Sequence, residues 1–451
     1  MWAPKTIDVS KPLYLAVFEA LEKDIRSGLL QPGEKLPTHR KLADMIGVTL
    51  GTATRIYREA ERRGLVAGIV GRGTFVTVGA CKRPGLIDAG KPHLVWDMGI
   101  AHPVNKPDPF LAAVSRKALQ KRRQQTLMSY SDPQGLLEHR GIGSDWLSRF
   151  GLNIPPKNIV ITAGAQHALF LACNCFFKAG DRIASDDLTF PGMKVAAQRN
   201  GLRLEGVPMD KEGMVPAELE ALCNRQQIKG IYLSGRIQNP TNIFMSQERR
   251  VELCKIILRH NLLLIENDAH GCLSDSPHNI LSSMHPEQSV FISSVSKAVL
   301  AGLRIAFAAV PEHLVSILAQ GIADSMICVS PLCAEIATEA IQDRQINSII
   351  QRKKTLIAKR VTMFRKIFAD HEFNITDHSM SAWLLLPRSL KAAELEAEAA
   401  RRNIKIFSSE RFAVGSTPAP EAVRISLTGI EDLGQLRRAL RTLENLVPKQ
   451  L

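Results

Sequence analysis

The chain has 451 residues, of which 45% are hydrophobic and 23% are charged. This balance is typical of soluble globular proteins, and it excludes a wholly disordered or fibrous chain. At roughly 150 residues per domain, the length predicts about three compact units. No apolar run approaches the roughly 18 residues that span a bilayer, and Lys5, Asp8 and Lys11 precede any apolar stretch that could act as a signal. We therefore expect a cytoplasmic protein without a membrane segment.

The eight cysteines are scattered and show no paired CxxC spacing, which argues against structural zinc or a dithiol redox centre. We expect free thiols and no metal site. The net charge is +14, and its density is highest in the first fifth of the chain, where residues 1–83 hold 14 Lys/Arg against 8 Asp/Glu. This basic segment favours a polyanionic partner.

Three short helices are predicted in the first 64 residues. Apolar residues recur at three- and four-residue steps over residues 12–27, and further helices are expected over 38–47 and 49–64. A tight turn containing glycine joins the last two helices, as in a helix-turn-helix. The segment LVAGIVGRGTFVTV then predicts two short strands, which form a wing.

The third helix carries side chains that suit phosphates and base edges in a major groove. These are Thr49, Thr52, Arg55 and Arg58. Arg72 lies between two glycines of the wing and can approach a DNA backbone or minor groove closely. Basic residues on one helix are equally compatible with a solvated face, but the ordered set of three helices and a wing favours DNA binding.

The segment LPTHRKLADMIGVTLGTATRIYREAERRGLV, followed by GRGTFV, resembles the GntR family of bacterial regulators over roughly residues 10–78. The resemblance implies contacts with double-stranded DNA at Arg40, at the start of the recognition helix and at the wing. The chain departs from the family at Leu50, where many relatives have an arginine, and Gly51 follows it. We therefore expect a different preferred operator. We assign 1–78 to the winged helix-turn-helix domain and 79–93 to a linker.

The remainder of the chain, 94–451, predicts an α/β fold. Apolar runs such as NIVITAG, DRIASDD, IKGIYLS, NLLLIEND, SVFISS and RIAFAAV alternate with helical stretches, which indicates a mainly parallel sheet flanked by helices. We expect a large part over about 120–330 and a smaller α+β part over about 331–451. Ligands of such sheets bind at the carboxyl ends of the strands.

Two of these strand ends predict a phosphate site. Gly164 ends the run NIVITAG, and Ala165 and Gln166 follow it and lead into a helix whose backbone N–H groups can hold a phosphate. SVFISS ends in a loop that contains two serines, a lysine and an arginine, namely Ser294, Ser296, Lys297 and Arg304. The serines and the guanidinium can clamp a phosphate, while Lys297 offers an amine for a Schiff base.

Over roughly 94–447 the chain resembles class I aminotransferases of fold type I, because the matching pieces occur in the family's order. The resemblance implies a pyridoxal 5'-phosphate cofactor held on Lys297, with Gly164 to Gln166, Ser294, Ser296 and Arg304 around its phosphate. It also implies a role for four further residues. Tyr130 in SYSDPQG would reach the phosphate across a dimer interface, Phe190 in LTFPG would stack on the pyridine ring, Asn239 in QNPT would bond the phenolic oxygen, and Arg424 in AVRISL would grip a substrate α-carboxylate.

One strand end departs from the family's pattern. Where the family has an aspartate that pairs the pyridine nitrogen and, three residues later, a tyrosine, this chain has Asn267 and His270. Asp268 can take the aspartate's place only if the strand slips by one residue, which requires a bulge. A neutral amide is a poorer partner for a protonated ring nitrogen, so we expect cofactor binding with slow turnover. The NPTG motif also becomes NPTN at Asn242.

A GntR-type winged helix on an aminotransferase-like body is the layout of the MocR subfamily, which the whole chain resembles. The resemblance implies a homodimer and a transcription regulator that senses pyridoxal 5'-phosphate, an amino acid or another small amine. The alternative is an active class I aminotransferase with an accessory DNA-binding domain.

Overall fold

The structure is a computed structural model. It describes residues 2–4, 12–26, 29–30, 34–62, 65–69, 73–76, 96–104, 109–120, 124–274, 280–415 and 419–449. The predicted linker and Arg72 lie outside these ranges.

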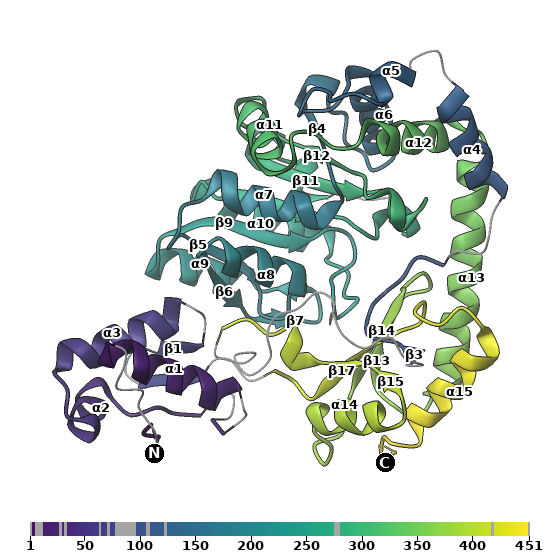
Figure 1. Ribbon diagram of the computed structural model, residues 1–451. Helices are drawn as coiled ribbons and strands as arrows, with labels where there is room; N and C mark the ends of the chain where they lie inside the picture. The colour runs from purple at the N-terminus through teal and green to yellow at the C-terminus, as the bar shows by residue number, and fades with distance from the viewer. Residues whose placement is uncertain are drawn as a thin grey trace.

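The N-terminal domain consists of three helices and a hairpin (Figure 1). The helices are α1 (Leu13–Arg26), α2 (His39–Ile46) and α3 (Leu50–Arg62), and the antiparallel strands are β1 (Val66–Ile69) and β2 (Gly73–Val76). Their apolar faces form a separate core that includes Phe18, Leu42 and Tyr57. The hydroxyl of Tyr57 donates to Pro37 O at 2.8 Å, which ties α3 to the segment before α2. These elements confirm the predicted helix-turn-helix with a wing.

The large part of the body contains a seven-stranded sheet. Its strands, in spatial order, are β4 (Ile159–Thr162), β12 (Ala306–Ala309), β11 (Ser289–Ser294), β10 (Leu263–Asn267), β9 (Ile228–Ser234), β5 (Arg182–Asp186) and β6 (Arg203–Val207). Strand β12 pairs antiparallel with both β11 and β4, and the other pairs of this sheet are parallel. The sheet is therefore mainly parallel, as predicted.

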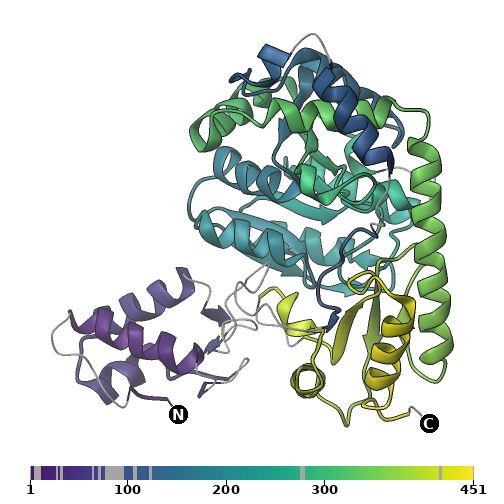
Figure 2. The ribbon, with the colours of Figure 1, turned by 45° about the vertical axis from the view of Figure 1, so that its right-hand side comes forward.

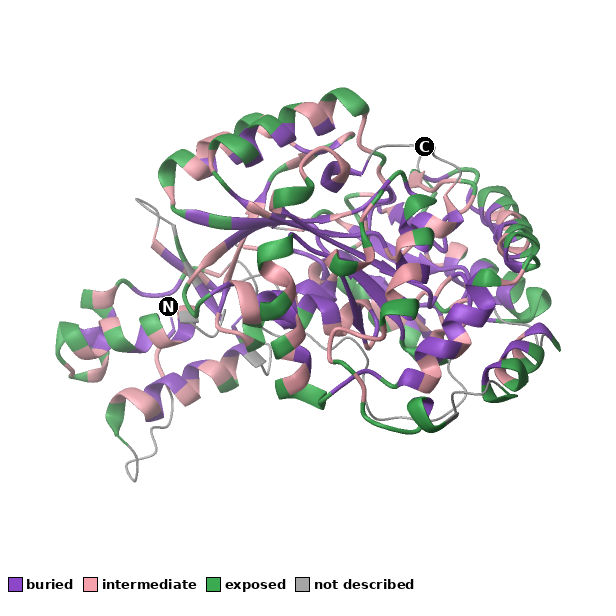
Figure 3. Ribbon diagram, turned by 90° about the horizontal axis from the view of Figure 1, so that it is seen from above, coloured by how far each residue is buried: buried purple, intermediate pink, exposed green. Residues whose placement is uncertain are grey.

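Helices cover both faces of this sheet, and its strands are the most deeply buried part of the body (Figure 3). The helices are α4 (Pro109–Gln120), α6 (Leu137–Ser148), α7 (Ala165–Phe176), α8 (Pro191–Arg199), α9 (Pro216–Arg225), α10 (Gln247–Arg259), α11 (Glu312–Met326) and α12 (Pro331–Gln342). Alternate residues of β9 enter different cores: Tyr232 packs in the cluster that contains α7, and Ile231 and Leu233 pack in the cluster that contains α9 and α10. Side chains at successive positions of a strand end therefore face different surroundings.

The C-terminal part is a four-stranded antiparallel sheet with three helices, shown in Figure 2. The strands, in order, are β13 (Phe373–Asn374), β14 (Ser381–Leu385), β17 (Ala422–Ser426) and β16 (Phe407–Ser408), and the helices are α13 (Ile346–Ile367), α14 (Ala392–Arg401) and α15 (Leu433–Glu444). Helix α13 spans two cores, because Ile349 packs with the large part and Phe364 packs with the small part. The predicted boundary near 331 precedes α12, whose buried residues lie in the larger core.

The segment at the start of the body pairs with the C-terminal part. Strand β3 (Trp96–Asp97) runs parallel to β15 (Ile404–Lys405), so residues 96–104 pass beside the small sheet. No described helix combines the length and the apolar composition that crossing a bilayer requires. The predicted fold class, a winged helix-turn-helix followed by an α/β body, is confirmed.

Candidate functional site

Capping residues define both ends of α2 and the start of α3. Thr38 Oγ1 accepts from Lys41 N at 3.3 Å, and Gly47 ends α2 with a left-handed φ of 67°. Thr49 Oγ1 accepts from Thr52 N at 3.2 Å and lies 3.0 Å from Thr52 Oγ1. These two threonines, both predicted to contact DNA, therefore also stabilise the start of α3.

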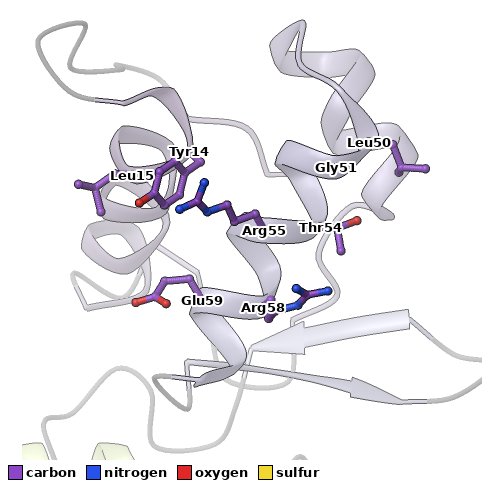
Figure 4. A pocket seen from close by; sticks show the side chains of 8 residues that line it. All are labelled: Tyr14, Leu15, Leu50, Gly51, Thr54, Arg55, Arg58 and Glu59. Atoms are coloured by element: carbon purple, nitrogen blue, oxygen red, sulfur yellow. The ribbon is translucent and has the colours of Figure 1, made fainter.

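The side chains of α3 point in two directions (Figure 4). Leu50, Thr54 and Arg58, at four-residue steps, point away from α1. Arg55 points toward α1, where its guanidinium carbon lies 3.8 Å from the centre of the Tyr14 ring. The two predicted DNA contacts Arg55 and Arg58 are thus on different sides of the helix. An open hollow of about 780 Å³ runs along this helix and is lined by Tyr14, Leu15, Leu50, Gly51, Thr54, Arg55, Arg58 and Glu59.

The start of α2 lies beside the outward face of α3. His39 Nδ1 is 3.2 Å from Thr54 Oγ1, and its ring centroid is 4.9 Å from that of Tyr57. Arg40, the next residue, is exposed. Arg58 therefore lies on the outward face of α3, and Arg40 is an exposed residue of the neighbouring helix α2.

In the body, the start of α7 and the loop after β11 form an anion-binding cradle. Gly164 has a φ of 87° and precedes α7, whose N-terminus has no side-chain cap. A Cβ at Gly164 would collide with the guanidinium of Arg304, so glycine lets the guanidinium lie against the backbone here without a shift. Arg304 Nη1 donates to Ser296 Oγ at 3.3 Å, and Ser294 Oγ donates to Ser296 Oγ at 3.0 Å. Helix N–H groups, two hydroxyls and a guanidinium together suit a phosphate.

Lys297 is half-buried at the edge of this cradle. Its Nζ donates to Ala101 O, in the segment that follows β3. Burial lowers the pKa of Lys297 to about 8, because the charged amine loses its hydration, and the cation of Arg424 lowers it further. Near pH 7 the neutral fraction of Lys297 is therefore larger than that of an exposed lysine. An amine must be neutral to act as a nucleophile.

Arg424, in the middle of β17, reaches across to the large part. Its Nη1 donates to Asn239 Oδ1 at 2.8 Å and its Nη2 donates to Gly99 O at 2.6 Å. The guanidinium carbon lies 4.7 Å from the centre of the Phe412 ring. Burial lowers the pKa of Arg424 to about 10, with a contribution from the cation of Arg411, so the group remains charged at neutral pH. A buried guanidinium of this kind can bind a carboxylate.

The end of β10 places its amide and its carboxylates on opposite faces. Strand β10 pairs with both neighbours in continuous register, with Asn267 beside Ser234 and Ile292. Because Ser294 lies two residues beyond Ile292 on β11, it shares the face of Asn267. The Oδ1 atom of Asn267 is buried and has no hydrogen-bond partner among the described residues. Asn267 is therefore on the same face as the phosphate cradle.

Asp268 faces the other way. Its Oδ1 accepts from Arg236 N at 3.3 Å, and its Oδ2 lies 3.8 Å from Arg236 Nε. Glu266, two residues earlier, accepts on Oε2 from Ser282 N at 2.8 Å. Neither carboxylate faces the side of the cradle, and no bulge interrupts β10.

His270 lies among the cations of the site. Burial lowers the pKa of His270 to about 3, and the charges of Lys297 and Arg424 lower it further, so the ring is neutral at pH 7. His102, which follows Ala101, also has a lowered pKa, first through burial and then through Lys297 and Lys405, against the opposing effect of Asp97. Both histidines are thus placed within electrostatic reach of Lys297.

Phe190 and Gln166 meet at the start of α8. A Cβ at Gly192 would come within 2.2 Å of a Phe190 ring carbon and 2.1 Å of Gln166 Oε1, so this glycine permits their approach. Gln166 Nε2 donates to Gly192 O at 2.9 Å. The ring of Phe190 is half-buried, next to the helix that begins at Ala165.

Asn242, at the position of the glycine in the NPTG motif, has a left-handed backbone conformation. Its φ is 59°, in the left-handed region that asparagine tolerates better than most residues. Its Nδ2 donates to Ser381 O at 2.8 Å and to Asn374 O at 3.2 Å. The side chain of Asn242 therefore links the loop after β9 to the small sheet.

Tyr130 is not brought to the site within one chain. Its exposed fraction is 80%, and it lies in the segment between α5 (Gln124–Leu127) and α6.

Sequence reasoning missed three partners of the site residues: Arg236, Phe412 and the carbonyl of Gly99. Only Arg236 had a visible signal, because it follows a strand in SGRIQNPT. A backbone carbonyl has no signature in sequence.

Comparisons with known proteins agree with this architecture. Residues 13–76 match the bacterial regulatory proteins of the gntR family, and residues 103–443 match aminotransferase class I and II. The uncharacterized HTH-type transcriptional regulator YdeF of Bacillus subtilis is 30% identical over 446 residues, which cover 99% of this chain and 96% of that protein. YdcR of Escherichia coli, also an uncharacterized HTH-type transcriptional regulator, is 25% identical and covers 89% and 92%.

Solved structures show the same fold for the body. An archaeal alanine:glyoxylate aminotransferase superposes with a TM-score of 0.72 at 20% identity, covering 79% of this chain and 91% of that one. The kynurenine aminotransferase of Pyrococcus horikoshii has a TM-score of 0.72 at 18% identity, covering 78% and 91%.

The fold defines an aminotransferase-like body, of a class whose fold implies dependence on pyridoxal 5'-phosphate, joined to a winged helix. The chain belongs to the aminotransferase class I and II family and, together with its GntR-type helix-turn-helix domain, has the MocR-type architecture of the regulators that it matches over almost its full length.

Proposed function

We propose that the protein is a DNA-binding transcription regulator whose body binds pyridoxal 5'-phosphate and responds to the cofactor or to an amino compound. One observation carries the proposal. A complete anion cradle with a nucleophilic lysine is retained beside Asn267, while the neighbouring carboxylate of Asp268 is occupied by Arg236. This combination favours cofactor binding over catalytic turnover, and the same chain carries a winged helix.

The residues present fit the cofactor. Ser294, Ser296, Arg304 and the first N–H groups of α7 would hold the phosphate, at the glycine where a Cβ would collide with the guanidinium. Lys297 would hold the aldehyde carbon. The remaining ring contacts would come from Phe190 on its face, Asn239 at the phenolic oxygen and Asn267 at the ring nitrogen.

When bound, pyridoxal 5'-phosphate supplies a ring that withdraws electrons from an attached amino compound. The ring does so most strongly when its nitrogen is protonated, and an anionic partner favours that protonation. Asn267 is neutral, so it can accept a hydrogen bond on its unpartnered Oδ1 but cannot supply charge. The cations Lys297, Arg304 and Arg424 around the site favour an anionic ligand such as an amino acid carboxylate.

The proposed macromolecular partners are a second copy of the chain and duplex DNA. The 80% exposure of Tyr130 is consistent with a role in the cofactor site of a second copy, and so with a homodimer. Arg40 and Arg58 would meet DNA phosphates, and a dimer would present two such domains to two half-sites.

The test uses the full-length protein. We expect fragments to be enriched from a random DNA library, with binding that falls steeply as salt rises. We also expect added pyridoxal 5'-phosphate to give a visible absorbance that candidate amines change, together with a change in DNA affinity. Turnover of amino and keto acids at ordinary enzyme rates, without selective DNA binding, would instead establish the alternative function, an active aminotransferase.

A further inference from the structure

An exposed apolar residue begins the recognition helix. Leu50 is the first residue of α3, and 46% of its surface is exposed. It points to the same side as Thr54 and Arg58, away from α1 (Figure 4). The other side chains that define this face, Thr54 and Arg58, are polar or charged, so an apolar side chain at this position is not explained by solvation.

Packing does not explain Gly51 either. The glycine is exposed, its φ is not in the left-handed region, and an added Cβ would meet only Thr49 Oγ1, at 3.7 Å. Most other residues would stabilise a helix by roughly 0.5–1 kcal/mol relative to glycine. Because Gly51 has no side chain, the first turn of α3 can approach a surface closely beside Leu50.

In a helix-turn-helix, the first residues of the second helix meet base edges in the major groove. A leucine side chain has no hydrogen-bond donor or acceptor, so it cannot distinguish the polar edges of guanine, cytosine or adenine. The apolar group on a base edge in the major groove is the 5-methyl group of thymine. Arg58, on the same face of α3, and the exposed Arg40 of α2 supply cations that can hold phosphates.

On the basis of the proposed DNA-binding function, we propose that Leu50 is a specificity-determining residue that reads a thymine methyl group, with Gly51 giving it access. Each half-site then contains a thymine that faces the first turn of α3. This thymine occupies the position at which an arginine in place of Leu50 would select guanine.

The first experiment identifies the thymine. Sites are selected from random duplex DNA with the full-length protein, and each conserved thymine is then replaced singly by uracil, which lacks only the methyl group. We expect one thymine in each half-site whose replacement weakens binding by about fourfold, the effect of one buried methyl group. The other thymines serve as internal controls.

The second experiment assigns that contact to Leu50. Leu50→Ala should make binding insensitive to uracil at this position. Leu50→Arg should change the selected base from thymine to guanine, by at least about fivefold, because arginine bonds guanine in a bidentate manner. Leu13→Arg is the matched control, since Leu13 is 43% exposed at the start of α1, and it should add the same charge without changing the selected base.

The outcomes separate the two proposals. If no DNA is enriched, the proposed regulator function fails. If DNA is enriched but no single uracil weakens binding, or if Leu50→Ala and Leu50→Arg leave the base preference unchanged, DNA binding stands and the role of Leu50 is overturned.

Discussion

The recognition helix and the cofactor site hold their functional side chains in opposite environments. Along α3 the outward residues Leu50 and Arg58 are exposed, and water surrounds them until a partner arrives. In the body, burial lowers the pKa of Lys297 to about 8 and that of His270 to about 3. An exposed cation acts through screened attraction to phosphates, whereas a buried amine acts through a changed protonation equilibrium. Substitutions in the two regions should therefore be detected by different measurements, namely salt dependence for α3 and spectra or pH profiles for the body.

The largest effect should come from Lys297→Ala. Removing the amine should abolish the visible absorbance of the bound cofactor and its trapping by borohydride, while circular dichroism shows an intact fold. Lys194→Ala is a matched control, because burial lowers the pKa of Lys194 to about 7 but its Nζ donates to Arg411 O and Ala413 O. If mass spectrometry places the reduced cofactor on Lys194, the assignment of Lys297 is wrong.

The pH dependence of cofactor attachment should be the next largest effect. Since the neutral amine is the nucleophile, the rate should rise about tenfold per pH unit below the pKa of about 8 and level off above it. Arg424→Gln should move the plateau to higher pH, because the neighbouring cation favours the neutral amine. Stopped-flow absorbance of the cofactor-free protein measures both profiles. A rate that keeps rising up to pH 10 would show that Lys297 is not desolvated.

Asn267→Asp should accelerate the half-reaction with an amino acid, by about tenfold for each 1.4 kcal/mol by which the carboxylate stabilises the transition state. The physical reason is that a carboxylate keeps the ring nitrogen protonated. Single-turnover spectra measure the rate. Asp268→Asn is the comparison, and it should lower the free energy of unfolding by leaving Arg236 without its buried counter-charge, with the spectrum retained. The opposite pattern, in which Asn267→Asp changes nothing and Asp268→Asn destroys the spectrum, would make Asp268 the ring partner.

The smallest effects should be those of single arginines on DNA binding. Arg40→Ala and Arg58→Ala, and also Arg72→Ala in the predicted wing, should each reduce the slope of affinity against salt by about one. Arg55→Ala should leave the slope unchanged, because its guanidinium lies on the Tyr14 ring. Fluorescence anisotropy at several salt concentrations measures these slopes. A loss of slope in Arg55→Ala equal to that of Arg40→Ala would show that Arg55 leaves Tyr14 when DNA binds.

Much of the molecule was predictable from the sequence, since local patterns carry the information. Helix periodicity and the glycine at the end of α2 predicted the winged helix, and apolar runs predicted the strands of the body. The same patterns located the loops at Gly164 and Ser294, because ligand-binding residues of such a sheet follow its strand ends. The spacing of Ser296, Lys297 and Arg304 within one short loop was enough to predict the anion cradle.

Only the tertiary structure decided which way neighbouring side chains point. The sequence left open whether Asn267 or Asp268 shares the face of the cradle, since a one-residue slip of a strand exchanges its two faces. Pairing with β9 and β11 gives β10 its register, and Arg236, from a different strand end, binds Asp268. Likewise, the two sides of α3 are distinguished by Tyr14 from α1. Composition and spacing determine which groups a segment carries, but contacts between segments far apart in the chain determine the face on which each group acts.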